Sequence, residues 1–320
     1  MINTIAATVE HHKEPSQTMY IAKHGVDGII NHNFIDSADI DSMEWQRIAN
    51  SPASSFGSSR LKLPPVEDKA FYQDLFAYLD QLHIHTFFCN GGNNSQHITR
   101  LMHLAAKQYG YPLTCIGIPK TIDNDIMHTD TCPGYGSAAK YTATSVYEIS
   151  LDLASVCHSS TQVLIYETMG RHAGWLAAST ALGKHSPLSG PHIILLPEAQ
   201  FTIPMLLGKI EQCLQQNKHC VICLAEGATD SEQILNNIRS EAPGQPLLGM
   251  VAPQLGHLIE QELKTRNHIV IPDYLQRAAR HLISKTDLDQ SKALAKEACR
   301  LAKLGVSGIM VAIKRDKTEP

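Results

Sequence analysis

Residues 113 to 125 read Leu-Thr-Cys-Ile-Gly-Ile-Pro-Lys-Thr-Ile-Asp-Asn-Asp, and this stretch decides the fold of the chain. Its apolar first half, Leu113–Ile118, has the length and composition of a buried strand. Its polar second half places the Lys120 ammonium three residues before one carboxylate, Asp123, and five before another, Asp125. Such groups can grip a phosphate, remove a proton from a hydroxyl and help to hold Mg²⁺. The stretch therefore indicates a strand of an α/β sheet whose carboxyl end carries polar chemistry.

Similar apolar runs alternate with amphipathic runs along the chain, which is the pattern of a parallel sheet covered by helices. Further strands are expected at Ile84–Cys89, Val163–Tyr166, His192–Leu196, Cys220–Leu224, His268–Ile271 and Ile309–Ile313. Helices are expected at Ile2–Val9, Gln96–Gln108, Ser137–Cys157, Gly174–Leu182 and Asp287–Leu304. The region Asn31–Leu63 is rich in Ser, Asp and Pro and is expected to carry surface turns.

The composition is that of an ordinary soluble globular protein, with 43% hydrophobic and 18% charged residues among 320, enough for about two domains. The formal charge of −4 argues against binding of nucleic acid by bulk charge. No apolar run approaches the roughly 20 residues that span a bilayer, and residues 1–13 do not resemble a signal peptide. The eight irregularly spaced cysteines are expected to be buried thiols in a reducing compartment, and the protein to be cytoplasmic. The seventeen histidines show no metal-ligand spacing, so no histidine metal site is expected.

The segment Gly91-Gly92-Asn93-Asn94-Ser95 is expected to turn the chain between a strand and a helix. Backbone N–H groups at a helix N-terminus form a natural anion site, and two glycines let a phosphate approach the backbone closely. A Gly-Gly turn without a ligand is the simpler alternative.

Polar residues follow three of the expected strands. Asp123 and Asp125 are expected to act as a base and a metal ligand, although carboxylates there can also cap a turn or a helix. Arg171, within Met169–Gly174, is placed to stabilise charge on a transferring phosphoryl group, unless it is an exposed Arg after a turn. Glu226 can hydrogen-bond sugar hydroxyls, or it is solvated. Because parallel strands bring their carboxyl ends to one edge, where such folds bind ligands, the coincidence favours a functional site.

Together these motifs resemble the phosphofructokinase family. The matching segments keep the family's order and spacing between about residues 57 and 277, and are Gly57-Ser58-Ser59-Arg60, Gly91–Ser95, Pro119–Asp125, Met169–Gly174, Ala225-Glu226-Gly227 and Tyr274-Leu275-Gln276-Arg277. The segments resembling the pyrophosphate-dependent branch are Asp273–His281, Ser284-Lys285-Thr286-Asp287 and the run to Val311.

The resemblance implies an α/β fold of two Rossmann-like three-layer domains with mainly parallel sheets. Residues 1–135 would form the phosphoryl-donor side and residues 136–320 the fructose 6-phosphate side, with the two domains interleaved. Compared with the family, the chain resembles a member shortened at both ends, without the first strand and its glycine loop.

On the sugar side, Asp123 matches the family's proton acceptor for the 1-hydroxyl of fructose 6-phosphate. Glu226 matches the sugar-binding glutamate, and Tyr274 and Arg277 match residues that reach the substrate phosphate. The remaining substrate contacts implied by position are Thr121, Met169, Gly170 and Arg171, and Arg171 is also assigned a catalytic role.

On the donor side, Lys120 occupies the position that is glycine in ATP-using members and lysine in pyrophosphate-using ones. An ammonium there fills nucleotide space and neutralises the leaving phosphate. The donor contacts implied by position are Arg60, Gly91, Gly92, Asn94 and Lys120, and the metal positions are Asn93 and Asp125.

The implied reaction is Mg²⁺-dependent transfer of a phosphoryl group from pyrophosphate to fructose 6-phosphate, a step of glycolysis. It yields fructose 1,6-bisphosphate and phosphate, and it should be near reversible because no nucleotide is consumed. The family resemblance also implies a homodimer or homotetramer, with fructose 6-phosphate and pyrophosphate as the binding partners.

Some positions depart from the family pattern. Asn94 stands where pyrophosphate users usually carry Asp, and Asn93 where many members have a metal-binding Asp. With both neutral, Mg²⁺ would depend mainly on Asp123, Asp125 and the substrate phosphates. Gln162 replaces an arginine that in many members reaches the sugar phosphate across a subunit interface.

Three functions remain open from the sequence. The first is an active pyrophosphate-dependent phosphofructokinase. The second is a non-catalytic remnant or binding subunit that retains the sugar-phosphate pocket, as Asn94 and the missing first strand suggest. The third is an ATP-dependent 6-phosphofructokinase, against which Lys120 argues.

Overall fold

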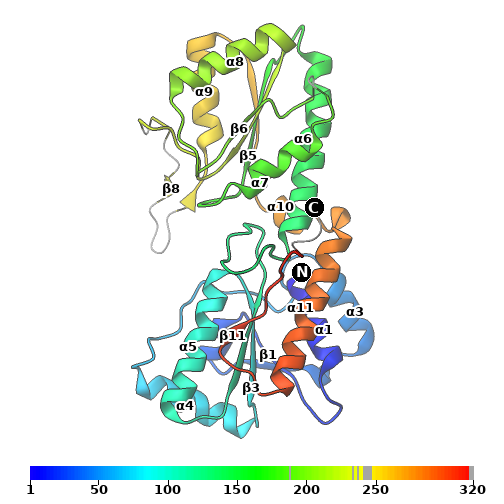
Figure 1. The fold of residues 1–320 in the computed structure, drawn as a ribbon, viewed down its shortest axis with the longest axis vertical. Helices are drawn as coiled ribbons and strands as arrows, with labels where there is room; N and C mark the ends of the chain where they lie inside the picture. Colours follow the sequence, from blue (N-terminus) through cyan, green and yellow to red (C-terminus); the bar gives the residue numbers. More distant parts are fainter. Residues whose placement is uncertain (187–188, 233, 236–237, 241–246, 317–320) are drawn as a thin grey trace. The chain divides into compact units, whose positions relative to one another are not determined.

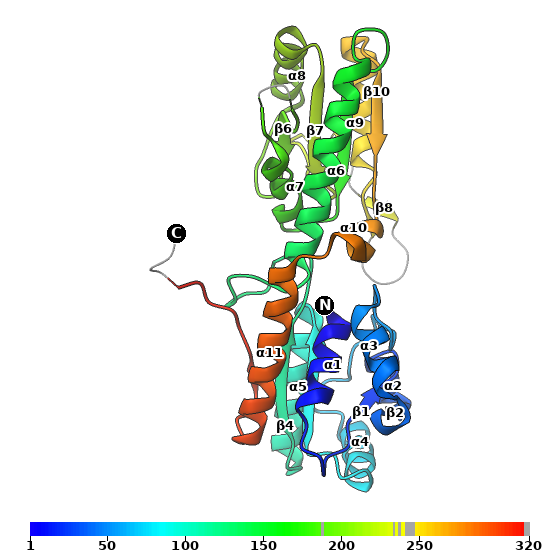
Figure 2. The ribbon, with the colours of Figure 1, turned by 90° about the vertical axis from the view of Figure 1, so that its right-hand side faces the viewer.

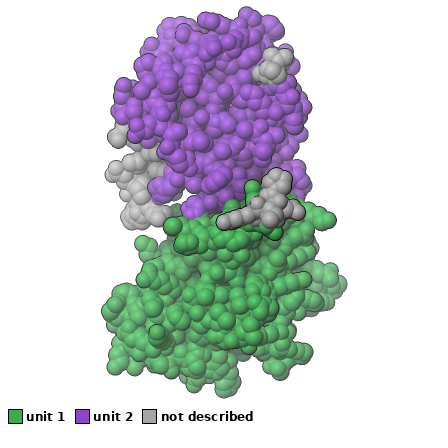
Figure 3. All heavy atoms as spheres, viewed as in Figure 1, with its two compact units in different colours: residues 1–121, 126–134, 284–320 green, residues 122–125, 135–283 purple. Residues whose placement is uncertain are grey.

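The computed structural model describes residues 1–186, 189–232, 234–235, 238–240 and 247–316. The chain divides into two compact units (Figure 3). Unit 1 comprises residues 1–121, 126–134 and 284–320, and unit 2 comprises residues 122–125 and 135–283. Each unit is therefore assembled from segments that are far apart in the sequence.

The centre of unit 1 is a parallel sheet in the order β11-β4-β3. Its strands are β3 (Thr86–Gly91), β4 (Thr114–Pro119) and β11 (Ile309–Met310). The helices around it are α1 (Ile2–His12), α4 (Lys69–Gln81), α5 (Asn93–Tyr109) and α11 (Lys285–Lys303). The expected strand Ile309–Ile313 is thus shorter than predicted, because only its first two residues pair with β4.

Side chains of β4 alternate between the two faces of this sheet. Cys115 is buried against α4 and α5, whereas Ile116 and Ile118 are buried against α1 and α11. Figure 2 shows α1 and α11 lying next to each other in unit 1. A strand that buries both faces has to be apolar throughout, which explains the uninterrupted hydrophobic run in the sequence.

The amino-terminal part of unit 1 is more regular than the sequence indicated. Strands β1 (Tyr20–Ala22) and β2 (Phe34–Asp36) pair antiparallel, with α2 (Val26–Ile30) between them. The region Asn31–Leu63 carries turns, as expected, but it also contains β2 and the helix α3 (Ser42–Asn50), which the sequence did not indicate.

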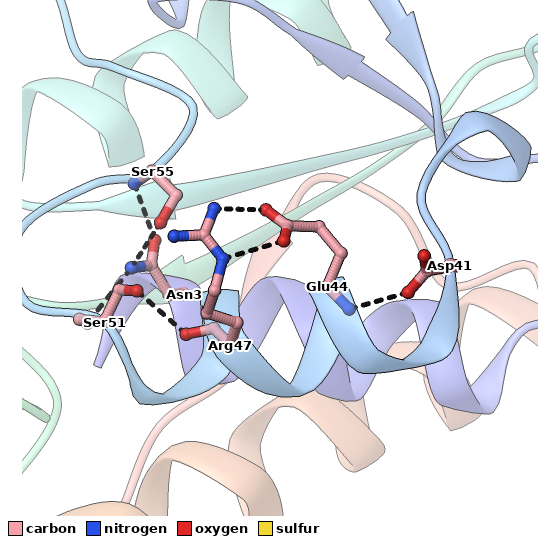
Figure 4. Close-up of polar contacts among 6 residues, drawn as sticks. All are labelled: Asn3, Asp41, Glu44, Arg47, Ser51 and Ser55. Carbon is pink, nitrogen blue, oxygen red and sulfur yellow. Dashed lines mark hydrogen bonds and ion pairs between the residues drawn. The ribbon is translucent and has the colours of Figure 1, made fainter.

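Helix α3 depends on its cap and on tertiary contacts more than on an apolar face, since Ile48 is its one buried side chain. The Asp41 carboxylate accepts a hydrogen bond from the Glu44 N–H at 2.8 Å, and the Arg47 guanidinium binds the Glu44 carboxylate (Figure 4). The buried Asn3 of α1 donates to the Ser51 carbonyl at 3.2 Å and to the Ser55 hydroxyl at 3.0 Å. Because α3 buries a single apolar side chain, the spacing of apolar residues in the sequence did not predict this helix.

Unit 2 contains a four-stranded parallel sheet in the order β10-β5-β7-β6. Its strands are β5 (Val163–Thr168), β6 (Ile193–Leu195), β7 (Cys220–Ala225) and β10 (Asn267–Val270). Figure 1 shows helices on both faces of this sheet. These helices are α6 (Tyr135–Val156), α7 (Trp175–Ser179), α8 (Ile203–Asn217) and α9 (Val251–Leu263). Unit 2 also contains shorter elements, which are the 3-10 helices η2 (Thr180–Gly183) and η3 (Arg280–Leu282), the strands β8 (Ile238–Ser240) and β9 (Leu247–Leu248), and the helix α10 (Leu275–Ala278).

The odd and even residues of β5 face different layers of unit 2. Val163 and Ile165 pack in the cluster that contains α8 and α9, whereas Leu164 and Tyr166 pack in the cluster that contains α6. Both units thus confirm the α/β class with parallel sheets covered on two faces. Among the residues that the structure describes, no helix is long and apolar enough to cross a membrane.

Candidate active site

In unit 1, the two predicted phosphate-binding segments meet at the carboxyl ends of β3 and β4. Gly91 and Pro119 are paired in the parallel register, and the Lys120 N–H donates to the Gly91 carbonyl at 3.0 Å. The Gln96 side-chain amide donates to the Gly91 carbonyl at 2.9 Å and to the Ile118 carbonyl at 3.3 Å. The backbone of Lys120 is therefore held against the glycine turn.

Helix α5 begins at Asn93, directly after its N-cap Gly92, and not at Gln96 as expected. Asn93 and Asn94 consequently lie in the first helical turn with exposed side chains. Gly92 makes no side-chain cap, and the N-terminus of this 17-residue helix has the geometry that favours anions. A Cβ at residue 92 would lie 3.8 Å from the Lys120 carbonyl oxygen, so Lys120 lies next to this helix end.

The residues of the loop after β4 belong partly to unit 1 and partly to unit 2. Thr121 belongs to unit 1, where its N–H donates to the Pro133 carbonyl at 3.1 Å, and residues 122–125 belong to unit 2. Asn124 adopts the left-handed conformation with φ 54°, which separates a half-buried Asp123 from an exposed Asp125. The two carboxylates therefore differ in their exposure to water.

In unit 2, the ends of β5 and β7 are joined through backbone hydrogen bonds. The Glu226 N–H donates to the Thr168 carbonyl at 2.8 Å, and the Gly227 N–H donates to the Gly170 carbonyl at 3.0 Å. The Glu226 carboxylate in turn accepts from the Gly170 N–H at 3.4 Å. The predicted segments Met169–Arg171 and Ala225–Gly227 are therefore one connected structure.

Burial and nearby charged groups shift the pKa of the Glu226 carboxyl. Burial is the main cause that raises the pKa of the Glu226 carboxyl, and the carboxylates of Glu167 and Asp123 raise it further. The Gly170 N–H and the Arg171 guanidinium act in the opposite direction. Three predicted site residues, Glu226, Arg171 and Asp123, thus influence one another within unit 2.

An open hollow lies beside Glu226. It is lined by Glu167, Thr168, Met169, Glu226, Gly249, Met250, Ile271, Asp273 and Gln276. The buried Gln276 accepts a hydrogen bond from the Met169 N–H at 3.2 Å and donates to the Asp273 carbonyl at 3.2 Å. A concave surface with a carboxylate and a thioether suits a ligand that carries hydroxyl groups.

Sequence reasoning predicted two of the nine residues that line this hollow, Met169 and Glu226, and among those it missed are Glu167 and Gln276. The signal for Glu167 was present, since it is a carboxylate inside the apolar run of β5. Gln276 carried no local signal, because only the tertiary contact with Met169 shows its role.

Tyr274 and Arg277 follow the carboxyl end of β10, as expected, and both side chains are exposed. The Arg277 guanidinium carbon lies 4.9 Å from the centre of the Tyr274 ring. This cation–π contact holds the guanidinium next to the Tyr274 side chain. The same segment contributes Asp273 and Gln276 to the lining of the hollow.

Two other predicted positions lie elsewhere. Arg60 is exposed in the coil between α3 and α4. Four residues earlier in the same coil, the Phe56 carbonyl accepts a hydrogen bond from the His24 N–H. Gln162 directly precedes β5, at its amino end, whereas the hollow lies at the carboxyl end of that strand. The Gln162 side-chain amide donates to the Lys218 carbonyl at 3.4 Å. Within the described part of one chain, neither residue lines the hollow.

We expect Gly227→Ala to destabilise the protein. A Cβ at residue 227 would lie 1.9 Å from the Arg171 carbonyl oxygen and 2.7 Å from the Arg171 carbonyl carbon, and backbone atoms cannot move aside as a flexible side chain can. Overpacking of this kind costs about 1–3 kcal/mol of unfolding free energy, which denaturant titration measures.

The matched control is Gly208→Ala in α8, where a Cβ would meet no atom within 4 Å. Replacing a helical glycine there should stabilise the protein by up to about 1 kcal/mol. Equal stability of the Gly227 variant and the wild type would contradict the close approach of the two strand ends.

Comparison with known proteins agrees with these observations. The sequence profile of the family described as Phosphofructokinase matches residues 1–301. A pyrophosphate–fructose 6-phosphate 1-phosphotransferase of Xanthomonas campestris pv. campestris is 42% identical over 303 residues, covering 93% of this chain and 72% of that protein. The Halomonas elongata protein of the same name is 39% identical over 312 residues, covering 97% of this chain and 74% of its own.

The crystal structure of a pyrophosphate-dependent phosphofructokinase from Marinobacter aquaeolei matches the fold with a TM-score of 0.87 and 38% sequence identity, covering 99% of this chain and 76% of that one. The resemblance inferred from the motifs is confirmed over most of the sequence. The chain therefore belongs to the phosphofructokinase family.

Proposed function

We propose that this chain transfers a phosphoryl group from pyrophosphate to the 1-hydroxyl of D-fructose 6-phosphate, giving fructose 1,6-bisphosphate and phosphate. The observation that carries the proposal is the joined end of β5 and β7, where Met169–Arg171 and Glu226 meet beside a hollow within unit 2. The names of relatives with 39–42% identity support the same reaction.

The sugar side would be formed mainly by residues of unit 2, within residues 136–320. Glu226 would accept hydrogen bonds from sugar hydroxyls, and Met169 would pack against the sugar carbons. Arg171, whose charge already lowers the pKa of Glu226, would stabilise negative charge on the transferring group. Thr121, Tyr274 and Arg277 would complete the substrate contacts, with Arg277 as the cation for the 6-phosphate.

The donor side would be formed by unit 1 residues within residues 1–135. The N–H groups at the start of α5, next to Gly91, Gly92 and Asn94, would hold one phosphate of pyrophosphate. Lys120 would neutralise the leaving phosphate, because its backbone is anchored at that turn. Arg60 would be a further donor contact.

The chemical step follows from these roles. Asp123 would take the proton of the 1-hydroxyl as its oxygen attacks one phosphorus of pyrophosphate. The bond between that phosphorus and the bridging oxygen breaks, and phosphate leaves with the electron pair. Because a phosphoanhydride is exchanged for a phosphate ester without a nucleotide, we expect the reaction to run in both directions.

Mg²⁺ would supply charge neutralisation between the phosphates when bound. Asn93 and Asp125 are exposed residues with side-chain oxygens, the type of ligand that Mg²⁺ prefers. In such sites the ion keeps several waters and takes phosphate oxygens. We further propose a homodimer or homotetramer working in the cytoplasm, where its eight cysteines, all among the described residues, stay as free thiols.

The test is an assay of the purified chain with Mg²⁺, pyrophosphate and fructose 6-phosphate, followed by direct detection of fructose 1,6-bisphosphate. We expect product with pyrophosphate, none with ATP, and loss of product on chelation of Mg²⁺. Formation of pyrophosphate from fructose 1,6-bisphosphate and phosphate is the expected reverse reaction. Binding of fructose 6-phosphate without turnover would contradict the catalytic proposal and leave a binding subunit instead.

A further inference from the structure

Glu167 is a carboxylate inside an otherwise apolar strand. It occupies the fifth position of β5 and is only 3% exposed. Charged side chains are almost never buried to this extent unless they are hydrogen-bonded. Its oxygens accept hydrogen bonds from a distant segment: Oε1 from the Met250 N–H at 2.9 Å and Oε2 from the Ala252 N–H at 2.8 Å.

The segment that Glu167 holds is the turn 249–252 at the start of α9. Gly249 has φ 113° and Met250 has φ 67°, so two successive residues adopt conformations with positive φ. The N-cap residue Met250 makes no side-chain capping hydrogen bond. Glu167 instead accepts the hydrogen bond from the Ala252 N–H in the first turn of α9. A negative charge at a helix N-terminus is also favoured by the helix dipole.

This turn borders the same hollow as the predicted sugar residues. Gly249 and Met250 line it together with Met169 and Glu226, and Glu167 lies two residues before Met169, which directly follows β5. A Cβ at residue 249 would lie 3.0 Å from Glu167 Oε1, so the turn and the carboxylate are in close contact. Glu167 therefore lines the hollow and also contacts the turn that forms part of its wall.

We propose that Glu167 is a positioning residue of this site, which fixes the turn 249–252 at the edge of the hollow and holds a second negative charge near Glu226. Through the turn it places Met250, whose side chain would limit the size of the ligand. Through its charge it adds to the burial that raises the pKa of Glu226. The identity of the ligand, fructose 6-phosphate, rests on the proposed function.

The direction of the charge effect can be worked out from the groups that face Glu226. These are Glu167 from β5, Arg171 after β5, Asp123 from the loop after β4 and Asp273 after β10. Removing the Glu167 charge removes one of the causes that raise the pKa of Glu226. Glu226 should then ionise at lower pH, and ligand binding that needs ionised Glu226 should persist to lower pH.

Two variants separate the two effects. Glu167→Gln removes the charge and replaces one acceptor oxygen with an NH2 donor, so one of the two backbone N–H groups, Met250 or Ala252, loses its acceptor. Glu167→Asp keeps the charge but is one methylene shorter, so the hydrogen bonds to Met250 and Ala252 are lost. The matched control is Glu198→Gln, because the exposed Glu198 accepts the Gly174 N–H at 2.8 Å at the start of α7 and does not line the hollow.

The measurements are made on the full chain without ligand and then with fructose 6-phosphate. We expect hydrogen exchange at the Met250 and Ala252 amides to rise about tenfold or more in both Glu167 variants. We expect the dissociation constant of fructose 6-phosphate to rise about tenfold, since a displaced wall misplaces the ligand. The titration midpoint of Glu226, followed by NMR of labelled glutamate, should fall in Glu167→Gln and stay near the wild-type value in Glu167→Asp.

Each outcome decides one question. Wild-type amide exchange in both variants, or an unchanged Glu226 midpoint in Glu167→Gln, would overturn the positioning role. If the wild type does not bind fructose 6-phosphate, the proposed function fails, while exchange and titration in the ligand-free protein still decide the role of Glu167. If Glu167→Gln does not fold, exchange and ligand affinity in Glu167→Asp decide that role, with Glu198→Gln remaining like the wild type.

Discussion

Asp123→Asn is expected to lower kcat by about 10²–10⁴-fold, the usual contribution of a general base. The amide has the shape of the carboxylate but cannot take the proton from the attacking hydroxyl. The residue is half-buried and precedes Asn124, whose positive φ shapes the loop, so an isosteric change should leave the fold intact. The measurement is kcat with saturating pyrophosphate, Mg²⁺ and fructose 6-phosphate.

The conditions of this assay matter because the Asp123 charge also raises the pKa of Glu226. Loss of that charge should lower the pKa of Glu226, so the two enzymes should be compared at a pH where Glu226 is ionised in both. Asp130→Asn is the matched control: this exposed carboxylate accepts hydrogen bonds from Lys314 and from the Arg315 N–H. A full kcat in the Asp123 variant would show that another group is the base.

Lys120→Met is expected to lower kcat/KM for pyrophosphate by about 10²–10³-fold, as removal of one group that stabilises transition-state charge does. Methionine keeps much of the side-chain length, and the hydrogen bond from the residue 120 N–H to the Gly91 carbonyl does not depend on the side chain. The loss should therefore reflect the missing ammonium. Initial rates over a range of pyrophosphate concentrations measure it.

The control for this variant is Lys140→Met, since Lys140 is an exposed lysine of unit 2 that donates to the Ile283 carbonyl. The donor is tested with Lys120→Gly and ATP. In an ATP-dependent enzyme that change should not impair turnover, because glycine would leave room for the nucleotide. A large loss with either donor therefore excludes the ATP-dependent alternative.

Much of the sheet structure could be predicted from local sequence. The runs at 113–118, 163–166 and 220–224 are apolar throughout because their strands are buried on both faces, and the structure confirms β4, β5 and β7 within one or two residues. Helix α5 began three residues earlier than expected, because Asn93 to Ser95 resemble turn residues when their helical neighbours are ignored.

The sequence by itself determined the family, the class of fold and the positions of the polar segments after the strands. Those features depend on residue type and on spacing along the chain, so they are visible without coordinates. The pairing of Gly91 with Pro119 and of Thr168 with Ala225 then follows from the parallel register.

Only the tertiary structure decided how those segments are supported. Glu167 meets Met250 and Ala252 more than 80 residues further along the chain, and Gln276 meets Met169 across 107 residues. In unit 1, Asp287 accepts the Gly134 N–H at 2.8 Å across 153 residues. A buried carboxylate or amide is stable only with partners, and partners brought together by folding leave no trace in the spacing of the sequence.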